Sequence, residues 1–510
     1  MEKNNNSGLF ERSVPEKEGV PSECIALFLT KLYEQSINIH SVLFFRNFKL
    51  IFDGYYEPFG ENTLHRMFSV TKSFVSAAVG ILAGKGKIDL DSPVIKYFPE
   101  YDRDCKDKLV RAATVRQLLK MQSPHEKTAF KQISDDDYVK SFFRLEASKV
   151  PGTAFSYDTS ASHTLCALAE KISGKSLLDF LRDEFLRDLG FSDEAYCIKD
   201  PLGRSMGGSG LMAKPLDVAV FAHVFLNGGK LWGKYDGKRV IPEDYAEAAV
   251  SKQSDTFVKG GFSEEKQGYG YQFWRISHNG YMCYGIGGQL AVILPDFNFV
   301  MVTTGDTLES KNDIEKIFQM FWKFIYPRFS NEPLPENDRW FSILEKAKKS
   351  LFIEPVPFKN DFFGKNITGR VFNISENEFG IKNLTIDIIG LEEILDAEEI
   401  DRFKNKYGCE SEFGKIYFDS DKGEFELIFG FDRNVYQDFP YYEYKCLASG
   451  TFLSDNVLIV KCHIIDEEIG TVWFQADVNA SGEGVLLTKK NVGTGFEEFN
   501  RCYIITCDVF

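Results

Sequence analysis

The chain has 510 residues, of which 44% are hydrophobic and 26% are charged, a composition typical of folded globular proteins. A chain of this length is too long for one ordinary core, so two or more domains are expected. The net charge of −15 argues against a nucleic-acid surface, which requires clustered Lys and Arg, and against adhesion to an anionic membrane. We therefore expect neither nucleic acid nor a membrane as a partner.

The N-terminal residues 1–6 are polar and include no apolar segment, so no secretion signal is visible. The longest apolar helical stretch, 74–83, is too short to span a bilayer. The ten cysteines form no Cys-x-x-Cys pair, which is typical of reduced and mostly buried thiols. The histidines show no ligand spacing, so no metal and no cofactor are expected. These features together predict a cytoplasmic protein.

In chain order, the first predicted elements are strands at 41–45 and 49–52, joined by a polar turn. A helix is predicted from about Ser69 to Gly84, where a Gly-Lys-Gly segment is typical of a helix end. Thr114 is expected to cap the next helix. Further helices are predicted at 160–172 and 177–186.

Glycines then cluster at 203–210, which indicates a loop near a site or a tight crossing of segments. A helix at 215–225 precedes two predicted adjacent strands, 281–295 and 297–304, and a closing helix at 313–324. Strands at both ends of this region, with helices between them, predict a sheet that is assembled from distant parts of the chain and flanked by helices.

The segment 326–337 contains three prolines and several polar residues and is interpreted as part of a linker, followed by a short helix at 340–349. Beyond residue 355 the pattern changes to short alternating strands with Gly and Asn turns, typical of an all-β sandwich or barrel. The predicted domains are therefore 1–328 and 355–510, with a linker and short helix at 329–354.

Ser69-x-x-Lys72 is the first candidate for chemistry. If a helix begins near Ser69, Lys72 lies three residues on and on the same face, where its ammonium and the helix dipole can activate the hydroxyl. The alternative is an ordinary helix start with a surface lysine. A second copy, Ser263-x-x-Lys266, lies in a polar stretch without apolar periodicity and is interpreted as a solvated loop.

Two distant segments could complete such a site. Tyr157 follows a turn and precedes a helix, so it could project into a cleft, where a nearby ammonium would lower its pKa and make it a base. The alternative is a core tyrosine whose hydroxyl is satisfied. The glycine-rich segment 284–289 leads into a strand, where backbone N–H groups could hold an oxyanion. Its alternative is a bulge on an edge strand.

Two motifs that look more specific lack the neighbouring structure or residues that they require. The segment 203–207 fits the G-x-S-x-G pattern, but that elbow needs a buried strand before it and a helix after it. His125-Glu126 could open a zinc-binding helix, but Ala129 stands where the second histidine is needed.

The order of the three segments, Ser69-x-x-Lys72, Tyr157 and 283–289, resembles the serine β-lactamase and penicillin-binding-protein superfamily, on its class C β-lactamase and esterase branch. Short segments between these motifs also match the family over residues 10–328, including 89–94, 114–119, 151–157, 208–211 and 268–271. The sequence of residues 69–73 and the pair Gly285-Ile286 are most similar to those of the 6-aminohexanoate-dimer hydrolases and related carboxylesterases.

The resemblance implies an α/β (α+β) fold with an antiparallel sheet flanked by helices. It implies that Ser69 is the acyl-forming nucleophile, that Lys72 supplies positive charge, and that Tyr157 exchanges protons. It further implies an oxyanion hole from the backbone N–H groups of Ser69 and Ile286, with other substrate-binding positions at Gly285, Gly288 and Thr159. The tail after 355 is more loosely similar to β domains appended to some bacterial members.

Two positions depart from the family pattern. Thr159 stands where the family has Asn, and Cys283 stands where it has Lys, His or Trp. A missing lysine removes the charge that binds a carboxylate, so simple esters, amides or short peptides are expected as substrates in place of β-lactams. The leading hypothesis is a serine hydrolase that forms an acyl-enzyme on Ser69. The alternative is a non-catalytic ligand- or peptide-binding sensor, and the sequence leaves the oligomeric state open.

Overall fold

The computed structural model describes residues 9–310, 312–357, 364–390, 413–492 and 496–507. The polar segment 1–6, on which the prediction about secretion rests, lies outside these residues. The chain divides into two compact units, Met1–Phe352 and Ile353–Phe510. This division falls two residues before the predicted start of the β domain at 355.

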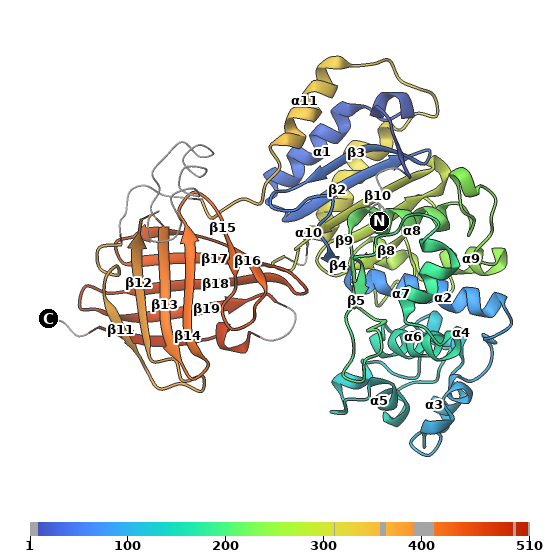
Figure 1. The fold of residues 1–510 in the computed structure, drawn as a ribbon, viewed down its shortest axis with the longest axis horizontal. Coiled ribbons are helices and arrows are strands. Elements are labelled where there is room, and N and C mark those ends of the chain that lie inside the picture. The colour runs from blue at the N-terminus through green and yellow to red at the C-terminus, as the bar shows by residue number, and fades with distance from the viewer. Residues whose placement is uncertain (1–8, 311, 358–363, 391–412, 493–495, 508–510) are drawn as a thin grey trace. The chain divides into compact units, whose positions relative to one another are not determined.

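The first unit is built on a sheet of seven strands in the order β1-β3-β2-β10-β9-β8-β7 (Figure 1). All neighbours are antiparallel except the parallel pair β1 and β3. Val42 of the N-terminal hairpin pairs with Thr303 near the end of the unit, so distant parts of the chain form one sheet, as predicted. In chain order the strands are β1 (Glu11–Arg12), β2 (Ile39–Arg46), β3 (Lys49–Tyr55), β7 (Trp274–Arg275), β8 (Tyr281–Gly285), β9 (Gln289–Leu294) and β10 (Phe299–Gly305).

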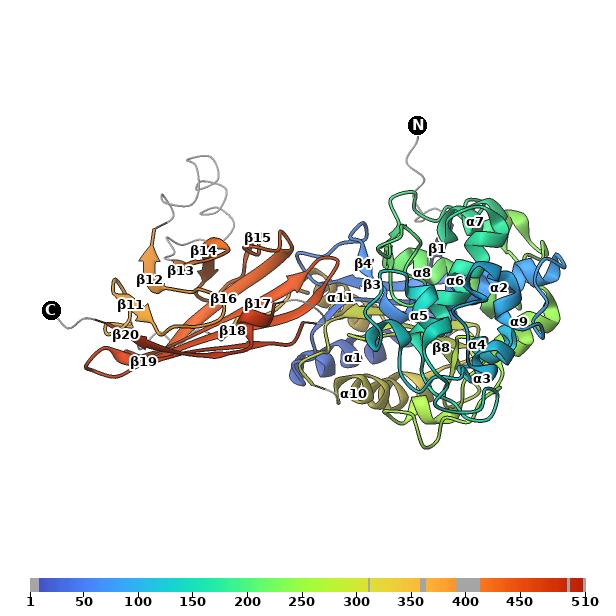
Figure 2. The ribbon, with the colours of Figure 1, turned by 90° about the horizontal axis from the view of Figure 1, so that it is seen from below.

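Alternating side chains divide the core between the two faces of this sheet. Phe44 packs in a cluster with α1 (Ser22–Glu34) and α10 (Asp313–Met320), whereas Phe45 packs in a cluster with α2 (Thr71–Gly84) and α8 (Pro215–Leu226). Figure 2 shows α1 and α10 on the side of the sheet opposite α8. Both faces are therefore covered by helices, as the resemblance implied.

The segment predicted as a linker packs on the first unit. Its helix α11 (Asp338–Lys349) contacts α1 and β3 (Figure 1). Lys348 of α11 also bonds to the buried Asp53 of β3. Residues 329–352 thus form part of this unit's outer helical layer.

The remaining helices surround α2, which is buried over most of its length and contacts α6 (Thr159–Ser173). Sequence signals locate their ends: Thr114 and Gln117 form a capping box at the start of α4, and Gly174, with φ +70°, ends α6. The other helices of this layer are α3 (Lys108–Ala112), α4 (Val115–Leu119), α5 (Tyr138–Arg144), α7 (Leu177–Leu181) and α9 (Glu243–Val250).

The predicted strand 281–295 is wrong in one respect, because it is a hairpin of two strands, β8 and β9. Gly287 and Gly288 have φ values of +87° and +91°, which only glycine adopts without strain, and they turn the chain back on itself. Gly285 pairs with Gln289 directly across this turn. The glycine-rich segment is therefore a hairpin turn, not the start of a strand or a bulge on an edge strand.

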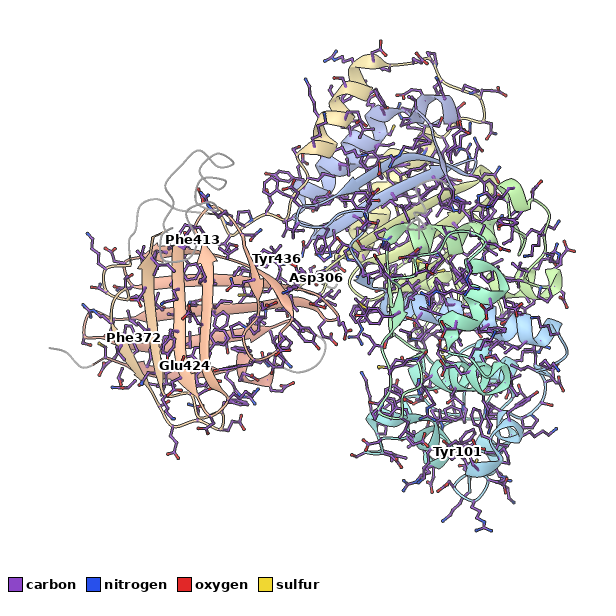
Figure 3. All side chains as sticks on the ribbon, in the orientation of Figure 1. Tyr101, Asp306, Phe372, Phe413, Glu424 and Tyr436 are labelled. Carbon is purple, nitrogen blue, oxygen red and sulfur yellow. The ribbon has the colours of Figure 1, made fainter. Side chains whose placement is uncertain are left out.

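The second unit is an all-β barrel. Its ten strands follow the order β14-β13-β12-β11-β20-β19-β18-β17-β16-β15, and an additional pairing of β14 with β16 closes the sheet. Phe372, labelled in Figure 3, is buried in the core, whereas Glu424, also labelled, is exposed next to the buried Phe425, as side-chain alternation along a strand requires. The strands are β11 (Val371–Ile374), β12 (Asn383–Ile389), β13 (Phe413–Ser420), β14 (Gly423–Gly430), β15 (Val435–Asp438), β16 (Lys445–Ser454), β17 (Val457–Ile465), β18 (Ile469–Val478), β19 (Glu483–Lys490) and β20 (Cys502–Thr506).

Among the described residues, no helix combines the length and the apolar character that a membrane crossing requires.

Candidate active site

Ser69 lies in a single 3₁₀ turn, Phe68–Val70, immediately before α2. The α-helix itself begins at Thr71, two residues later than predicted. Phe68 has φ +42°, an uncommon conformation for a non-glycine residue that is often found beside functional groups. Lys72 donates a hydrogen bond from Nζ to Ser69 Oγ at 2.9 Å. The structure thus brings the two residues of the first Ser-x-x-Lys motif together.

Lys72 is almost completely buried, with 1% of its surface exposed. Burial lowers its pKa to about 7, although the charge of nearby Asp158 acts in the opposite direction. The amine also donates a hydrogen bond to the carbonyl oxygen of Gly208 at 2.6 Å. The lysine is therefore held in place by a backbone carbonyl group and is close to half-protonated at neutral pH. Its burial excludes the alternative of a surface lysine.

The predicted glycine loop at 203–210 leads into β6 (Leu211–Ala213), which pairs with β4 (His65–Arg66) just before the nucleophile. Met67 N–H donates to the Leu211 carbonyl oxygen, and Leu211 N–H donates to Thr71 Oγ1. A Cβ at Gly208 would lie 2.3 Å from Thr159 Cγ2, so only glycine fits between α2 and α6. The loop therefore lies at the site, where it binds Lys72.

Tyr157 is next to both catalytic candidates. Its ring stacks on Trp274 with centroids 5.5 Å apart, and Lys72 Nζ lies 4.8 Å from its ring centroid. Burial raises the pKa of Tyr157, and its hydrogen bond with Ser69 only partly offsets this effect. The prediction that a neighbouring ammonium lowers the Tyr157 pKa is therefore wrong. Tyr157 is a neutral phenol at neutral pH.

The start of α6 fixes the position of Tyr157. Asp158 caps the helix by accepting a hydrogen bond from Ser160 N–H at 2.9 Å, and it accepts another from Ser123 Oγ at 2.8 Å. Asp158 is fully buried, and burial raises its pKa. Thr159, half-buried, packs against Gly208 at the first position of the helix.

The turn between β8 and β9 carries the predicted oxyanion positions. A Cβ at Gly285 would lie 2.2 Å from the Met67 carbonyl oxygen, so any larger residue there would collide with the segment before Ser69. The hairpin backbone thus lies directly against this segment. Ile286 follows in the turn, with 51% of its surface exposed. The Gly288 carbonyl oxygen accepts a hydrogen bond from Thr303 Oγ1 at 2.8 Å, which ties the turn to β10.

Cys283, the second departure from the family pattern, is fully buried. Burial raises its pKa to about 12, although a hydrogen bond with Ser73 opposes this change. The thiol is consequently neutral and offers no charge to a substrate.

Two residues with no specific signal in the sequence complete the surroundings of the site. Gln272, with φ +63°, donates from Nε2 to the Leu119 carbonyl oxygen at 2.8 Å and accepts from Ser162 Oγ at 2.6 Å. Its own carbonyl oxygen accepts a hydrogen bond from Ser73 Oγ at 2.7 Å. Gln272 thereby connects α2, α4 and α6, and Trp274 supports Tyr157. The only pointer to either residue in the sequence is the matching phrase 268–271 just before them.

The second Ser-x-x-Lys copy is solvent-exposed at Ser263 and Lys266, as predicted, but it is a helical turn and not a loop. It forms a 3₁₀ helix, η9 (Glu264–Gln267), in which Glu264 is buried and accepts hydrogen bonds from Ser277 N–H at 2.6 Å and Trp322 Nε1 at 2.9 Å. Ser263 and Lys266 are both exposed, and Ser263 donates its hydroxyl hydrogen bond to Glu315.

The segment 203–207 is followed by the strand β6, not by the helix that a nucleophile elbow requires. Ser205, at the centre of the segment 203–207, is buried and accepts a hydrogen bond from Lys199 Nζ at 3.1 Å. Within the described part of the chain, no group of three His, Cys, Asp or Glu residues is placed to hold a metal ion.

A Ser-x-x-Lys pair at the start of a buried helix, with a tyrosine beside it between a sheet and a helical layer, is the arrangement expected of the serine β-lactamase and penicillin-binding-protein superfamily. The model of the family described as Beta-lactamase matches residues 29–317, more than half of the chain. The chain belongs to this family.

Individual relatives are more distant. The chain is 23% identical over 267 residues to a 6-aminohexanoate-dimer hydrolase from Paenarthrobacter ureafaciens, covering 48% of this chain and 66% of that protein. It is 26% identical over 162 residues to esterase EstB from Burkholderia gladioli, covering 28% of this chain and 41% of that protein. The alignments thus span less than two thirds of the length of either relative.

A solved structure from Bacillus anthracis, provisionally named as a 6-aminohexanoate-dimer hydrolase, superimposes with a TM-score of 0.51 at 22% identity. The superposition covers 63% of this chain and 88% of that one. At this level of identity the likeness shows the shared fold alone.

Proposed function

We propose that this protein is a serine hydrolase that cleaves an ester or amide through an acyl-enzyme on Ser69. The observation that carries the proposal is the 2.9 Å hydrogen bond between Lys72 Nζ and Ser69 Oγ, made by a lysine whose pKa burial lowers to about 7. At neutral pH a large share of this lysine is uncharged, and an uncharged amine at that distance can accept the serine proton.

In the proposed reaction, Lys72 takes the proton of Ser69 as Oγ forms a bond to the substrate carbonyl carbon. The oxyanion then lies between the backbone N–H groups of Ser69 and Ile286. Tyr157 gives its proton to the leaving alkoxide or amine as the carbonyl–leaving-group bond breaks, and it regains a proton from Lys72. A water molecule releases the acyl group by the same steps in reverse, which restores Ser69.

Esters and amides are the proposed substrate class. The relatives with sequence similarity are named as an esterase and as a hydrolase of an amide dimer, which supports this class. The neutral, buried Cys283 leaves no cation at the position where the family pattern has Lys, His or Trp, so carboxylate-bearing β-lactams lack their usual partner.

A serine-reactive fluorophosphonate probe tests the proposal. The wild-type chain should become labelled, and Ser69→Ala should abolish labelling. Ser263→Ala, which alters the exposed serine of the second motif copy, should be labelled like wild type. Unchanged labelling of Ser69→Ala would contradict the proposal. No turnover of a broad ester and amide panel, with saturable ligand binding that survives Ser69→Ala, would support the sensor alternative instead.

A further inference from the structure

The turn 286–288, between β8 and β9, is held by its carbonyl groups. The carbonyl oxygens of its two glycines accept hydrogen bonds from the Thr307 N–H at 3.2 Å and from Thr303 Oγ1 of β10 at 2.8 Å. The third carbonyl oxygen, that of Ile286, accepts a longer hydrogen bond from Gln289 Nε2 at 3.3 Å. Gln289 is thus the side chain that holds the residue proposed as an oxyanion donor.

Gln289 reaches this turn from a place where β9 and β10 separate. The backbone pairing of the two strands ends at Leu290 and Thr303, and the pairing of β10 with β2 shifts register between Thr304 and Gly305. The side-chain amide of Gln289 spans the gap. Its Nε2 donates to the Gly305 carbonyl oxygen at 2.7 Å, and its Oε1 accepts from the Gly305 N–H at 3.3 Å. The amide therefore makes the two bonds that a paired backbone would make.

All polar groups of this amide are used inside the protein. A glutamine side chain has two N–H donors and one acceptor oxygen, and here they bond to Ile286 and Gly305. The side chain of Gln289 is buried, with 1% of its surface exposed. Because a buried amide that loses its partners is costly, these bonds hold Gln289 in one orientation. Gln289 thereby connects the Ile286 carbonyl group firmly to β10.

The other side of the turn is open. Among the described residues, the Ile286 N–H donates no hydrogen bond. The preceding residue, Gly285, lies against Met67, and β8 contacts the 3₁₀ turn that carries Ser69. The turn is therefore fixed through its carbonyl groups and keeps an unused N–H next to the segment of the nucleophile. A donor that is fixed before the reaction is what stabilisation of an oxyanion requires.

We propose that Gln289 is a positioning residue for acyl transfer, which fixes the Ile286 N–H for the oxyanion by holding the Ile286 carbonyl oxygen. This inference rests on the proposed hydrolase function and adds to it a residue that touches no substrate. The pairing of Gly285 with Gln289 sets the peptide before Ile286, and the Gln289 amide sets the peptide after it. Without the amide, the peptide after Ile286 can rotate and the donor moves.

Two variants at position 289 test the role of the amide. Gln289→Met fills a similar volume without a hydrogen-bond donor, and it should lower kcat/KM for p-nitrophenyl butyrate by about tenfold or more, because small displacements of positioned groups are costly. Gln289→Glu keeps an acceptor for the Gly305 N–H but has no donor at neutral pH, so it should lose at least as much. It also serves as the test if the Met variant does not fold, and urea unfolding shows which chains are folded.

Gln319→Met is the matched control, because it makes the same change at an exposed glutamine of α10. It should keep the wild-type kcat/KM. Folded Gln289→Met and Gln289→Glu chains whose kcat/KM lies within about twofold of wild type would overturn the inference.

Two ketones with the same acyl chain separate oxyanion positioning from a general loss of structure. When a trifluoromethyl ketone binds, Ser69 Oγ forms a bond to the carbonyl carbon, the carbonyl π pair becomes the oxyanion, and the hydroxyl proton passes to Lys72. The matching methyl ketone binds largely without this addition. By calorimetry, Gln289→Met should weaken binding of the trifluoromethyl ketone by about tenfold and of the methyl ketone by less than about twofold. Equal weakening of both ketones would overturn the inference.

The same titrations distinguish this inference from the hydrolase proposal. If Ser69→Ala weakens binding of the trifluoromethyl ketone but Gln289→Met does not, the inference fails and the hydrolase proposal stands. If Ser69→Ala binds the trifluoromethyl ketone as tightly as wild type, no adduct forms on Ser69, and both fail. Loss of affinity in both variants, with the methyl ketone little affected by Gln289→Met, supports the positioning role.

Discussion

Replacing Lys72 by Met is the sharpest test of the site's electrostatics. The amine is buried and its pKa is about 7 in the folded chain, compared with a usual value near 10.5. The folded state therefore binds fewer protons than the unfolded state between these two values. Because stability rises with pH wherever the unfolded state binds more protons, wild type should gain stability as the pH rises from 7 towards 10.5.

The size of this gain follows from the two pKa values. From pH 7 to pH 9 the folded lysine goes from about half-protonated to neutral, while the unfolded lysine stays charged. At about 1.4 kcal/mol for each pKa unit, wild type should gain about 2 kcal/mol over this interval through Lys72 alone. The Met variant has no titrating group at position 72, so it should lack this gain and should also lose activity.

The assay is urea unfolding of the first unit at pH 7 and pH 9, for wild type and Lys72→Met. The difference between the two chains in their pH dependence isolates Lys72, because all other titrating groups are shared. Lys87→Met, which alters an exposed lysine just after α2, is the control and should keep the wild-type pH dependence. An identical pH dependence in wild type and Lys72→Met would refute the lowered pKa and, with it, the role of Lys72 as a base.

Two further predictions concern turnover. The kcat/KM for a neutral ester should rise with pH through a midpoint near 7, because the base form of Lys72 is present above its pKa and is lost below it. A pH–rate profile measures this, and a flat profile from pH 5 to 9 would contradict it. Gly285→Ala should lower kcat by about tenfold or more, since the added Cβ would lie 2.2 Å from the Met67 carbonyl oxygen and displace the turn from Ser69. Kinetics within about twofold of wild type would contradict the close approach of Gly285 to Met67.

Much of the fold could be predicted because local and tertiary preferences agree. After Ser41, the strand at 41–45 is apolar at every position, and both faces of its sheet are covered, so its position in the sheet's interior follows from its composition. The caps at Thr114 and Gly174 are local signals that the structure retains. The hairpin of β8 and β9 was missed because its two strands form one apolar run in the sequence, interrupted only by a short glycine-rich segment.

The members of the site could be predicted from motif order, but their ionisation could not. Lys72 and Tyr157 come together as the order of segments implied. Burial then lowers the pKa of the lysine and raises that of the tyrosine, and burial depends on packing from segments such as Gly208 and Trp274 that lie far away in sequence.

The departure from the family pattern at position 283 bears on the charge of the substrate. A site that binds carboxylates needs a fixed cation, but position 283 holds a neutral buried thiol, and Lys72 is engaged by Ser69 and Gly208 and is largely uncharged above pH 7. Neither group therefore offers a fixed charge to an anionic substrate, which supports neutral esters and amides as the proposed substrates.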